Sequence, residues 1–71
     1  MDIAERLQEL RKKAGYSQEQ VAELLGLSRQ AVSKWESGQG KPDIDNIVKL
    51  TEVYHVSADY ILFGKEKEVM A

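Results

Sequence analysis

Five short stretches of helical periodicity follow one another along the chain, and cap residues and glycines separate them. This division of the chain constrains the fold more than any other feature. The stretches cover residues 2–15, 17–26, 28–37, 43–56 and 57–64. Each begins with a residue type that caps helix N-termini, namely Asp2, Ser17, Ser28, Asp43 and Ser57. Glycines, which adopt the left-handed backbone that ends many helices, close three of them at Gly15, Gly26 and Gly64. The pattern predicts an all-α fold, a compact bundle of five short helices.

Apolar residues recur at helical spacing within the stretches and predict which sides face the core. The predicted inward positions are Ile3, Leu7, Leu10 and Ala14, then Val21, Leu24 and Leu25, and finally Ile44, Ile47, Val48, Leu50 and Tyr54. Ser17, with Gln20 three residues later, predicts a capping box at the start of the second helix. Only two residues, Gly26 and Leu27, precede the cap of the third helix, and so short a connection favours a steep crossing of two short helices.

Chain length and cysteine content limit how such a bundle is stabilised. A chain of 71 residues builds one modest core, so well-packed helices, a disulfide or a metal must support it. There is no cysteine and one histidine, His55, so we expect helix packing alone, with no metal and no cofactor. The charged start is atypical of a signal peptide and no apolar run has the length of a membrane span. We expect a cytoplasmic chain without membrane contact, one domain over residues 1–64, and a charged, frayed tail over 65–71.

The third stretch, "GLSRQAVSKWESG", has an unusual polar side. On a helix, Arg29, Gln30, Ser33, Lys34 and Ser37 fall within an arc of roughly 140°. The opposite side holds Ala31, Val32 and Trp35. The polar arc therefore carries two cations, an amide and two hydroxyls, but no acid. A solvated helix face is the alternative interpretation, although such faces usually mix charges of both signs.

Charge is unevenly distributed around this helix. The whole chain has a net charge of −2. Residues 1–41 carry seven Lys or Arg against six Asp or Glu, a net of +1, whereas residues 42–71 carry three against six, a net of −3. Within 28–41, Glu36 is the only acid beside three cations. Because a local patch decides what docks on a surface, the donor-rich arc favours a negatively charged partner.

The segment "QEQVAELLGLSRQAVSKWESG" resembles the helix-turn-helix of the phage-repressor and Cro family, also called the xenobiotic-response-element family. The resemblance is carried by the small Ala22, by Gly26 at the turn, and by Val32 and Trp35 on the inner side of the second helix. The segments "WESGQGKPD" and "VYHVSADYILFG" extend it over about residues 3–64. It implies a sequence-specific, double-stranded-DNA-binding transcriptional regulator, a repressor, with helix 28–37 in the major groove.

The resemblance also assigns roles to individual residues. It implies base reading by Arg29, Gln30, Ser33 and Lys34, since arginine can bond guanine and glutamine can bond adenine in bidentate fashion. It implies phosphate contacts from Ser17, Gln18, Ser28, Ser37, Gln39 and Lys41. Plain helix capping is the alternative for Ser17 and Gln18. Arg11 and Glu36 match a pair that some repressors of the family bury as a salt bridge, which would keep Glu36 from repelling DNA.

A homodimer on a pseudo-palindromic operator is the assembly that the resemblance implies. For its contacts we expect Tyr60, Ile61 and Phe63, because "YILF" offers more apolar surface than so short a helix buries. The alternative is an antitoxin-like or adaptor module that binds proteins through the fifth helix. We expect no catalysis, since the small chain presents no carboxylate pair in apolar surroundings and only one histidine. No small-molecule ligand is evident, and "GQGKPD" lacks the glycines of a nucleotide-binding loop.

Overall fold

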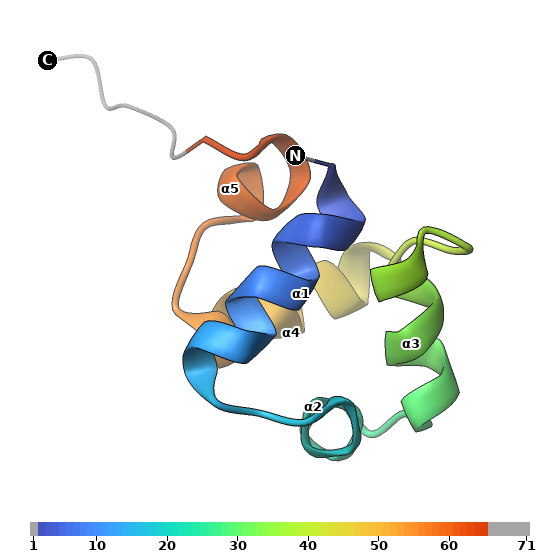
Figure 1. Ribbon diagram of the computed structural model, residues 1–71. Coiled ribbons are helices and arrows are strands. Elements are labelled where there is room, and N and C mark those ends of the chain that lie inside the picture. Colours follow the sequence, from blue (N-terminus) through green and yellow to red (C-terminus); the bar gives the residue numbers. More distant parts are fainter. Residues whose placement is uncertain (1, 66–71) are drawn as a thin grey trace, which may run out of the picture.

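The computed structural model describes residues 2–65, which contain five α-helices and no strand. The helices are α1 (Ile3–Ala14), α2 (Gln18–Leu25), α3 (Arg29–Ser37), α4 (Ile44–Tyr54) and α5 (Ala58–Phe63) (Figure 1). The all-α prediction is confirmed. Apart from Lys65, the predicted tail lies outside the described residues. Within residues 2–65, none of the helices combines the length and the apolar character needed to cross a bilayer.

Each helix begins directly after its predicted cap residue. Four of the caps, at Asp2, Ser17, Asp43 and Ser57, accept a hydrogen bond from a backbone N–H in the first turn. The predicted capping box is confirmed, because Ser17 Oγ accepts from Gln20 N at 3.0 Å and Gln20 Oε1 accepts from Ser17 N at 2.8 Å. Ser28 has the cap conformation but its side chain makes no capping hydrogen bond. The cap residues in the sequence therefore define where all five helices of residues 2–65 begin.

The core lies where the five helices meet, and its largest fully buried side chains are Leu50, Ile61, Val21 and Val32. Trp35 and Tyr54 are buried in the same cluster. Burial of apolar surface in such a core stabilises the folded state by roughly 25 cal/mol per Å². Because each helix contributes to this one cluster, the core fixes α2 and α3 relative to the rest of the molecule.

Four residues that spacing assigned to the core are exposed instead. Ala14, at the end of α1, and Leu24, Ile44 and Val48 all lie at the surface, so those predictions are wrong. The buried stripe of α2 is centred between Val21 and Leu25, and Leu24 lies about 80° around the helix from that centre. Ile44 and Val48 flank the stripe of α4 in the same way. Short helices with neighbours on one side bury only a narrow stripe, and apolar residues at its margins stay in contact with water.

A buried arginine that the apolar pattern did not reveal attaches α5 to α1. Arg6 is only 6 % exposed. Its Nε donates to the carbonyl of Ile61 and its Nη2 to that of Leu62, both at 3.0 Å. These carbonyls lie in the last turn of α5, where no intrahelical donor is available. Arg6 therefore donates hydrogen bonds to the free carbonyls at the end of α5, and its side chain is buried against this helix.

Candidate nucleic-acid interface

Three residues connect α2 to α3 and turn the chain sharply. Gly26 ends α2 in the left-handed region with φ 72°, and Leu27 N donates to Ala22 O at 2.8 Å. Figure 1 shows α2 end-on and α3 lengthwise, so the two helices cross steeply, as the short connection predicted. Ala22 and Val32 are buried in the core cluster with Trp35, which confirms the predicted inner side of this helix pair.

The outer side of α3 carries the residues that the sequence placed in one polar arc. We call Arg29, Gln30, Ser33, Lys34 and Ser37 the α3 donor face. Four of these side chains are exposed and Ser33 is half-buried. The hydroxyl of Ser37 donates to the Lys34 carbonyl at 3.2 Å. In Figure 1, α3 runs along one side of the molecule, at its surface.

The one acid of α3 points away from this face. Arg11 Nε lies 2.8 Å from Glu36 Oε2, and Arg11 Nη2 donates to Glu36 Oε1 at 2.9 Å. Both side chains are largely buried, at 14 % and 3 % exposed. This hydrogen-bonded pairing raises the pKa of the Arg11 guanidinium against the opposing effect of burial. The predicted salt bridge is confirmed, and it neutralises Glu36 inside the protein.

Gln18 connects this ion pair to the donor face. Its Nε2 donates to Glu36 Oε1 at 3.1 Å, and its Oε1 accepts from Arg29 Nη1 at 3.5 Å. The sequence predicted Gln18 only as a cap or phosphate contact and missed this inward bond. No periodicity could have found it, because it depends on how α2 crosses α3. The result is a continuous chain of polar contacts from Arg11 through Glu36 and Gln18 to Arg29.

The other predicted phosphate contacts lie at the ends of α2 and α3. Ser17, Ser28, Gln39 and Lys41 are exposed. The hydroxyl of Ser17 already accepts a capping bond, whereas Ser28 makes none. Beyond α3, the backbone N–H groups of Gln39 and Gly40 both donate to the Lys34 carbonyl, which folds the loop back onto the helix end. These positions therefore border the donor face at its start and its finish.

The predicted dimer contacts are only partly accessible. Phe63 is 70 % exposed and Tyr60 is half-buried, but Ile61 is fully buried in the core of the protomer. The expectation for Ile61 is therefore wrong, because a side chain with no exposed surface cannot contact a second copy. Leu62 is exposed beside Phe63 and was not predicted. A helix of six residues buries one side only, and Ile61 occupies that side.

These helices match a known family along most of the chain. A family model described as helix-turn-helix matches residues 7–61. The chain belongs to the helix-turn-helix family. The family is one of DNA-binding transcription regulators and not of enzymes. The resemblance to the phage-repressor and Cro group, stated from the residues of α2 and α3, is thereby confirmed.

Relatives and solved structures agree with this assignment. The HTH-type transcriptional regulator ImmR of Bacillus subtilis is 42% identical over 67 residues, which is 94% of this chain and 52% of that protein. The HTH-type transcriptional activator BcrR of Enterococcus faecalis is 41% identical over 71 residues, 100% of this chain and 35% of that protein. A crystal structure of the P22 c2 repressor with a synthetic operator superposes with a TM-score of 0.87 at 31% identity, covering 92% of this chain and 98% of that one. The chain thus spans between a third and a little over half of these two curated relatives.

Proposed function

We propose that the helix-turn-helix chain binds double-stranded operator DNA in a sequence-specific manner, with α3 in the major groove, and that it regulates transcription. The observation that carries this proposal is the acid-free α3 donor face, because Glu36, the one acid of α3, is turned inward and paired with Arg11. A polyanion approaching α3 therefore meets cations, an amide and hydroxyls of this helix, and none of its carboxylates. Phosphate neutralisation by such groups supplies much of the affinity for DNA.

We expect the first turn of α3 to recognise the DNA sequence. Arg29 and Gln30 occupy the N-terminal positions that reach base edges in this motif, with Ser33 and Lys34 about one turn further along. Arg29 suits a guanine and Gln30 an adenine. Gln18 is a positioning residue here, because its bond to Glu36 fixes the amide that Arg29 contacts. We also propose that Gln18, at the start of α2, contacts a backbone phosphate.

Phosphate contacts set the register of α3 in the groove without reading bases. Ser17 and Ser28 lie at the N-termini of α2 and α3, where free backbone N–H groups attract anions. Ser37, Gln39 and Lys41 supply a second group of contacts after α3. Lys41 adds a full charge there, so we expect it to contribute to affinity but little to sequence choice.

A homodimer on a pseudo-palindromic operator is the assembly we propose, because one small domain reads few base pairs and a second copy doubles the readout. The two α3 helices would lie roughly 34 Å apart, or a multiple of that distance. We propose Tyr60, Leu62 and Phe63 as the contacts, with Leu62 replacing the buried Ile61. Repression is the direction we propose, since occupying an operator blocks other proteins without any further contact.

A protein-interaction module is the second candidate, and the exposed Leu62 and Phe63 favour it. In that case α5 binds a partner protein, as in an antitoxin or adaptor, and the α3 donor face is a solvated surface. Apolar contacts depend little on salt, whereas DNA binding through several phosphates weakens steeply as salt rises. Salt dependence therefore separates the two candidates.

Selection from a randomised duplex library at two salt concentrations tests the proposal. We expect enrichment of a two-fold symmetric site at low salt and its loss at high salt. The recovered sequence would show directly which bases Arg29 and Gln30 prefer. A folded, dimeric protein that enriches no site at low salt would overturn the DNA-binding proposal and favour the α5 partner.

A further inference from the structure

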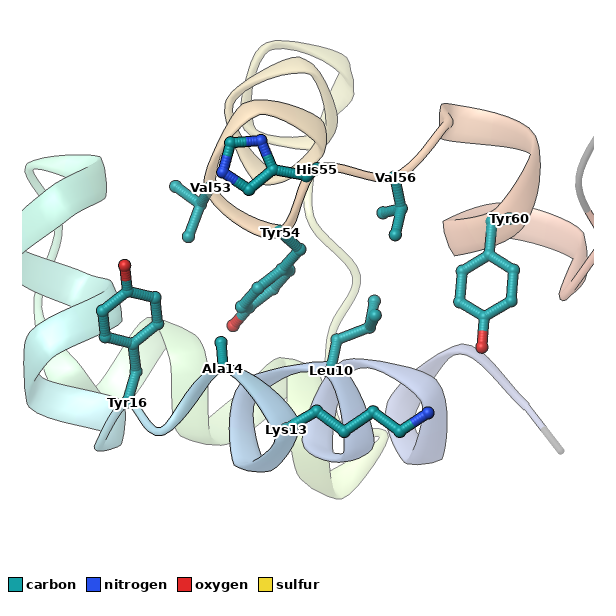
Figure 2. A pocket seen from close by; sticks show the side chains of 9 residues that line it. All are labelled: Leu10, Lys13, Ala14, Tyr16, Val53, Tyr54, His55, Val56 and Tyr60. Atoms are coloured by element: carbon teal, nitrogen blue, oxygen red, sulfur yellow. The ribbon is translucent and has the colours of Figure 1, made fainter.

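A cavity of about 540 Å³ lies away from the α3 donor face, between the C-terminal ends of α1 and α4 and the side of α5 (Figure 2). None of its lining residues belongs to α3. Leu10, Val53 and Val56 supply apolar walls. In Figure 2, Leu10 points up from α1 toward Val56, which points down from the connection between α4 and α5. The volume lies within the range of known small-molecule sites, and the depression is open to solvent on one side.

Tyr54 gives this cavity a buried hydrogen-bond donor. Its side chain is only 8 % exposed, yet among residues 2–65 its hydroxyl has no hydrogen-bond partner. No fully enclosed side-chain polar atom of the described residues lacks a partner, so this hydroxyl keeps some contact with solvent. Tyr54 lines the cavity, and in Figure 2 its hydroxyl points toward Ala14, which lines the cavity as well. Burial raises the pKa of the phenol, which keeps its proton available for donation. A phenol hydroxyl without a protein partner is free to donate to an acceptor placed in the cavity.

The other polar lining groups add cationic and donor character. Lys13 runs along α1, and the hydroxyl of Tyr60 points from α5 toward the same helix (Figure 2). The imidazole of His55 lies at the rim beside Val53. No Asp or Glu lines the cavity, although the chain is acidic overall. Glu36 acts electrostatically on Tyr54, but its charge is paired with Arg11.

We propose that this cavity binds a small organic carboxylate with an apolar, ring-sized body and a hydrogen-bond acceptor at its far end. The carboxylate would lie at the Lys13 and Tyr60 end, the body against Leu10 and Val56, and the acceptor at the hydroxyl of Tyr54. The α3 donor face stays free, so the ligand binds alongside any partner of α3. Tyr60 lines the cavity and belongs to the surface we propose for dimerisation, so occupancy is positioned to alter that surface.

Three matched probes test the proposal by NMR titration of the amide-labelled protein. The first, 3-(4-acetylphenyl)propionate, has both the carboxylate and the acceptor. Its methyl ester lacks the charge, and 3-(4-ethylphenyl)propionate lacks the acceptor. We expect saturable shifts of the cavity resonances with the first probe at millimolar concentrations and weaker binding of the other two.

Substitutions test which residue contacts each end of the ligand. Tyr54→Phe removes only an unpartnered hydroxyl, so it should fold normally and weaken the acetyl probe about fivefold while sparing the ethyl probe. Lys13→Met should weaken both acids about threefold but not the ester. Lys12→Met, on the same turn of α1 but outside the lining, is the matched control and should not change the binding of any probe.

The proposal is overturned if the acetyl probe gives no saturable shift. It is equally overturned if Tyr54→Phe weakens both acids alike, or if the cavity resonances respond only to protein concentration, which would assign the cavity to a second copy.

Discussion

The α3 side and the α5 side of the molecule bury opposite charges beneath opposite surfaces. Beneath α3 lies an acid, Glu36, while the surface above it presents cations and amides. Beneath α5 lies a cation, Arg6, while the surface above it presents Leu62 and Phe63. In both places the buried polar group is held by specific partners, a guanidinium in one case and helix-end carbonyls in the other. The comparison shows that burying the acid of α3 leaves a surface of cations and amides, whereas burying Arg6 leaves an apolar surface on α5. The charge that is buried therefore decides the character of the surface that a partner meets.

Removing Glu36 should have the largest effect on the α3 side. Glu36→Ala leaves Arg11 largely buried without its carboxylate, so we expect the free energy of unfolding to fall by about 3–5 kcal/mol. Urea unfolding measures the change. Glu23→Ala, at an exposed position of α2, is the control and should stay within about 0.5 kcal/mol. Equal losses in the two variants would show that the ion pair does not stabilise the fold.

Removing Arg6 tests the α5 side in the same way. Arg6→Met keeps most of the buried volume but leaves the carbonyls of Ile61 and Leu62 without this donor, and we expect a loss of about 2–3 kcal/mol. Hydrogen exchange should show the amides of α5 opening before those of α2 and α3. Unchanged protection in α5 would contradict the role assigned to Arg6.

Truncating Arg29 should affect binding without affecting stability. Arg29→Ala should weaken binding to the selected site by about 1–3 kcal/mol and relax the preference at one base pair. Because Arg29 is exposed, unfolding should change by no more than about 0.5 kcal/mol. Gln18→Ala should reproduce part of the binding loss if it positions Arg29. An unchanged base preference in Arg29→Ala would remove Arg29 from the base-reading residues.

Two glycines with the same backbone conformation sharpen the comparison further. Gly38 after α3 and Gly64 after α5 have φ of 83° and 78°. An added Cβ meets nothing within 4 Å at Gly38, but at Gly64 it lies 2.9 Å from Arg6 Nη1. Gly38→Ala should cost about 1 kcal/mol for the left-handed conformation, and Gly64→Ala about 1 kcal/mol more for displacing Arg6. Thermal unfolding of the pair checks the difference, and equal costs would mean that Arg6 adapts freely.

The smallest effect on stability is expected at the exposed apolar residues of α5. Phe63→Ser should change the free energy of unfolding of the isolated chain by no more than about 0.5 kcal/mol, because Phe63 buries little surface. Under the proposed dimer it should still raise the dissociation constant of the dimer, as measured by analytical ultracentrifugation. A large loss of stability with no change in self-association would place Phe63 in the core.

Most of the fold could be predicted from the sequence because its signals are local. The cap residues, the capping box and the turn at Gly26 act over three or four positions, and the structure places them as predicted. The failures all depend on tertiary packing. Exposure of Leu24 and burial of Ile61 follow from how many neighbours each helix has, which spacing alone does not encode.

The site was predicted less completely than the fold. The polar arc of α3 and the pair of Arg11 with Glu36 could be named, the first from periodicity and the second from a family resemblance. The inward bond of Gln18 and the buried Arg6 could not, because both are polar residues whose partners lie on other helices. Long polar side chains reach several ångströms, so their direction is set by the assembled structure.

The salt dependence of binding to the selected DNA site tests the central claim most directly. If the α3 donor face and its flanking residues contact phosphates, the logarithm of the binding constant should fall linearly with the logarithm of salt concentration, with a steep slope. Lys34→Met or Lys41→Met should make that slope shallower by about one charge. Binding that is insensitive to salt, or a slope that neither variant changes, would contradict the assignment of this surface to DNA.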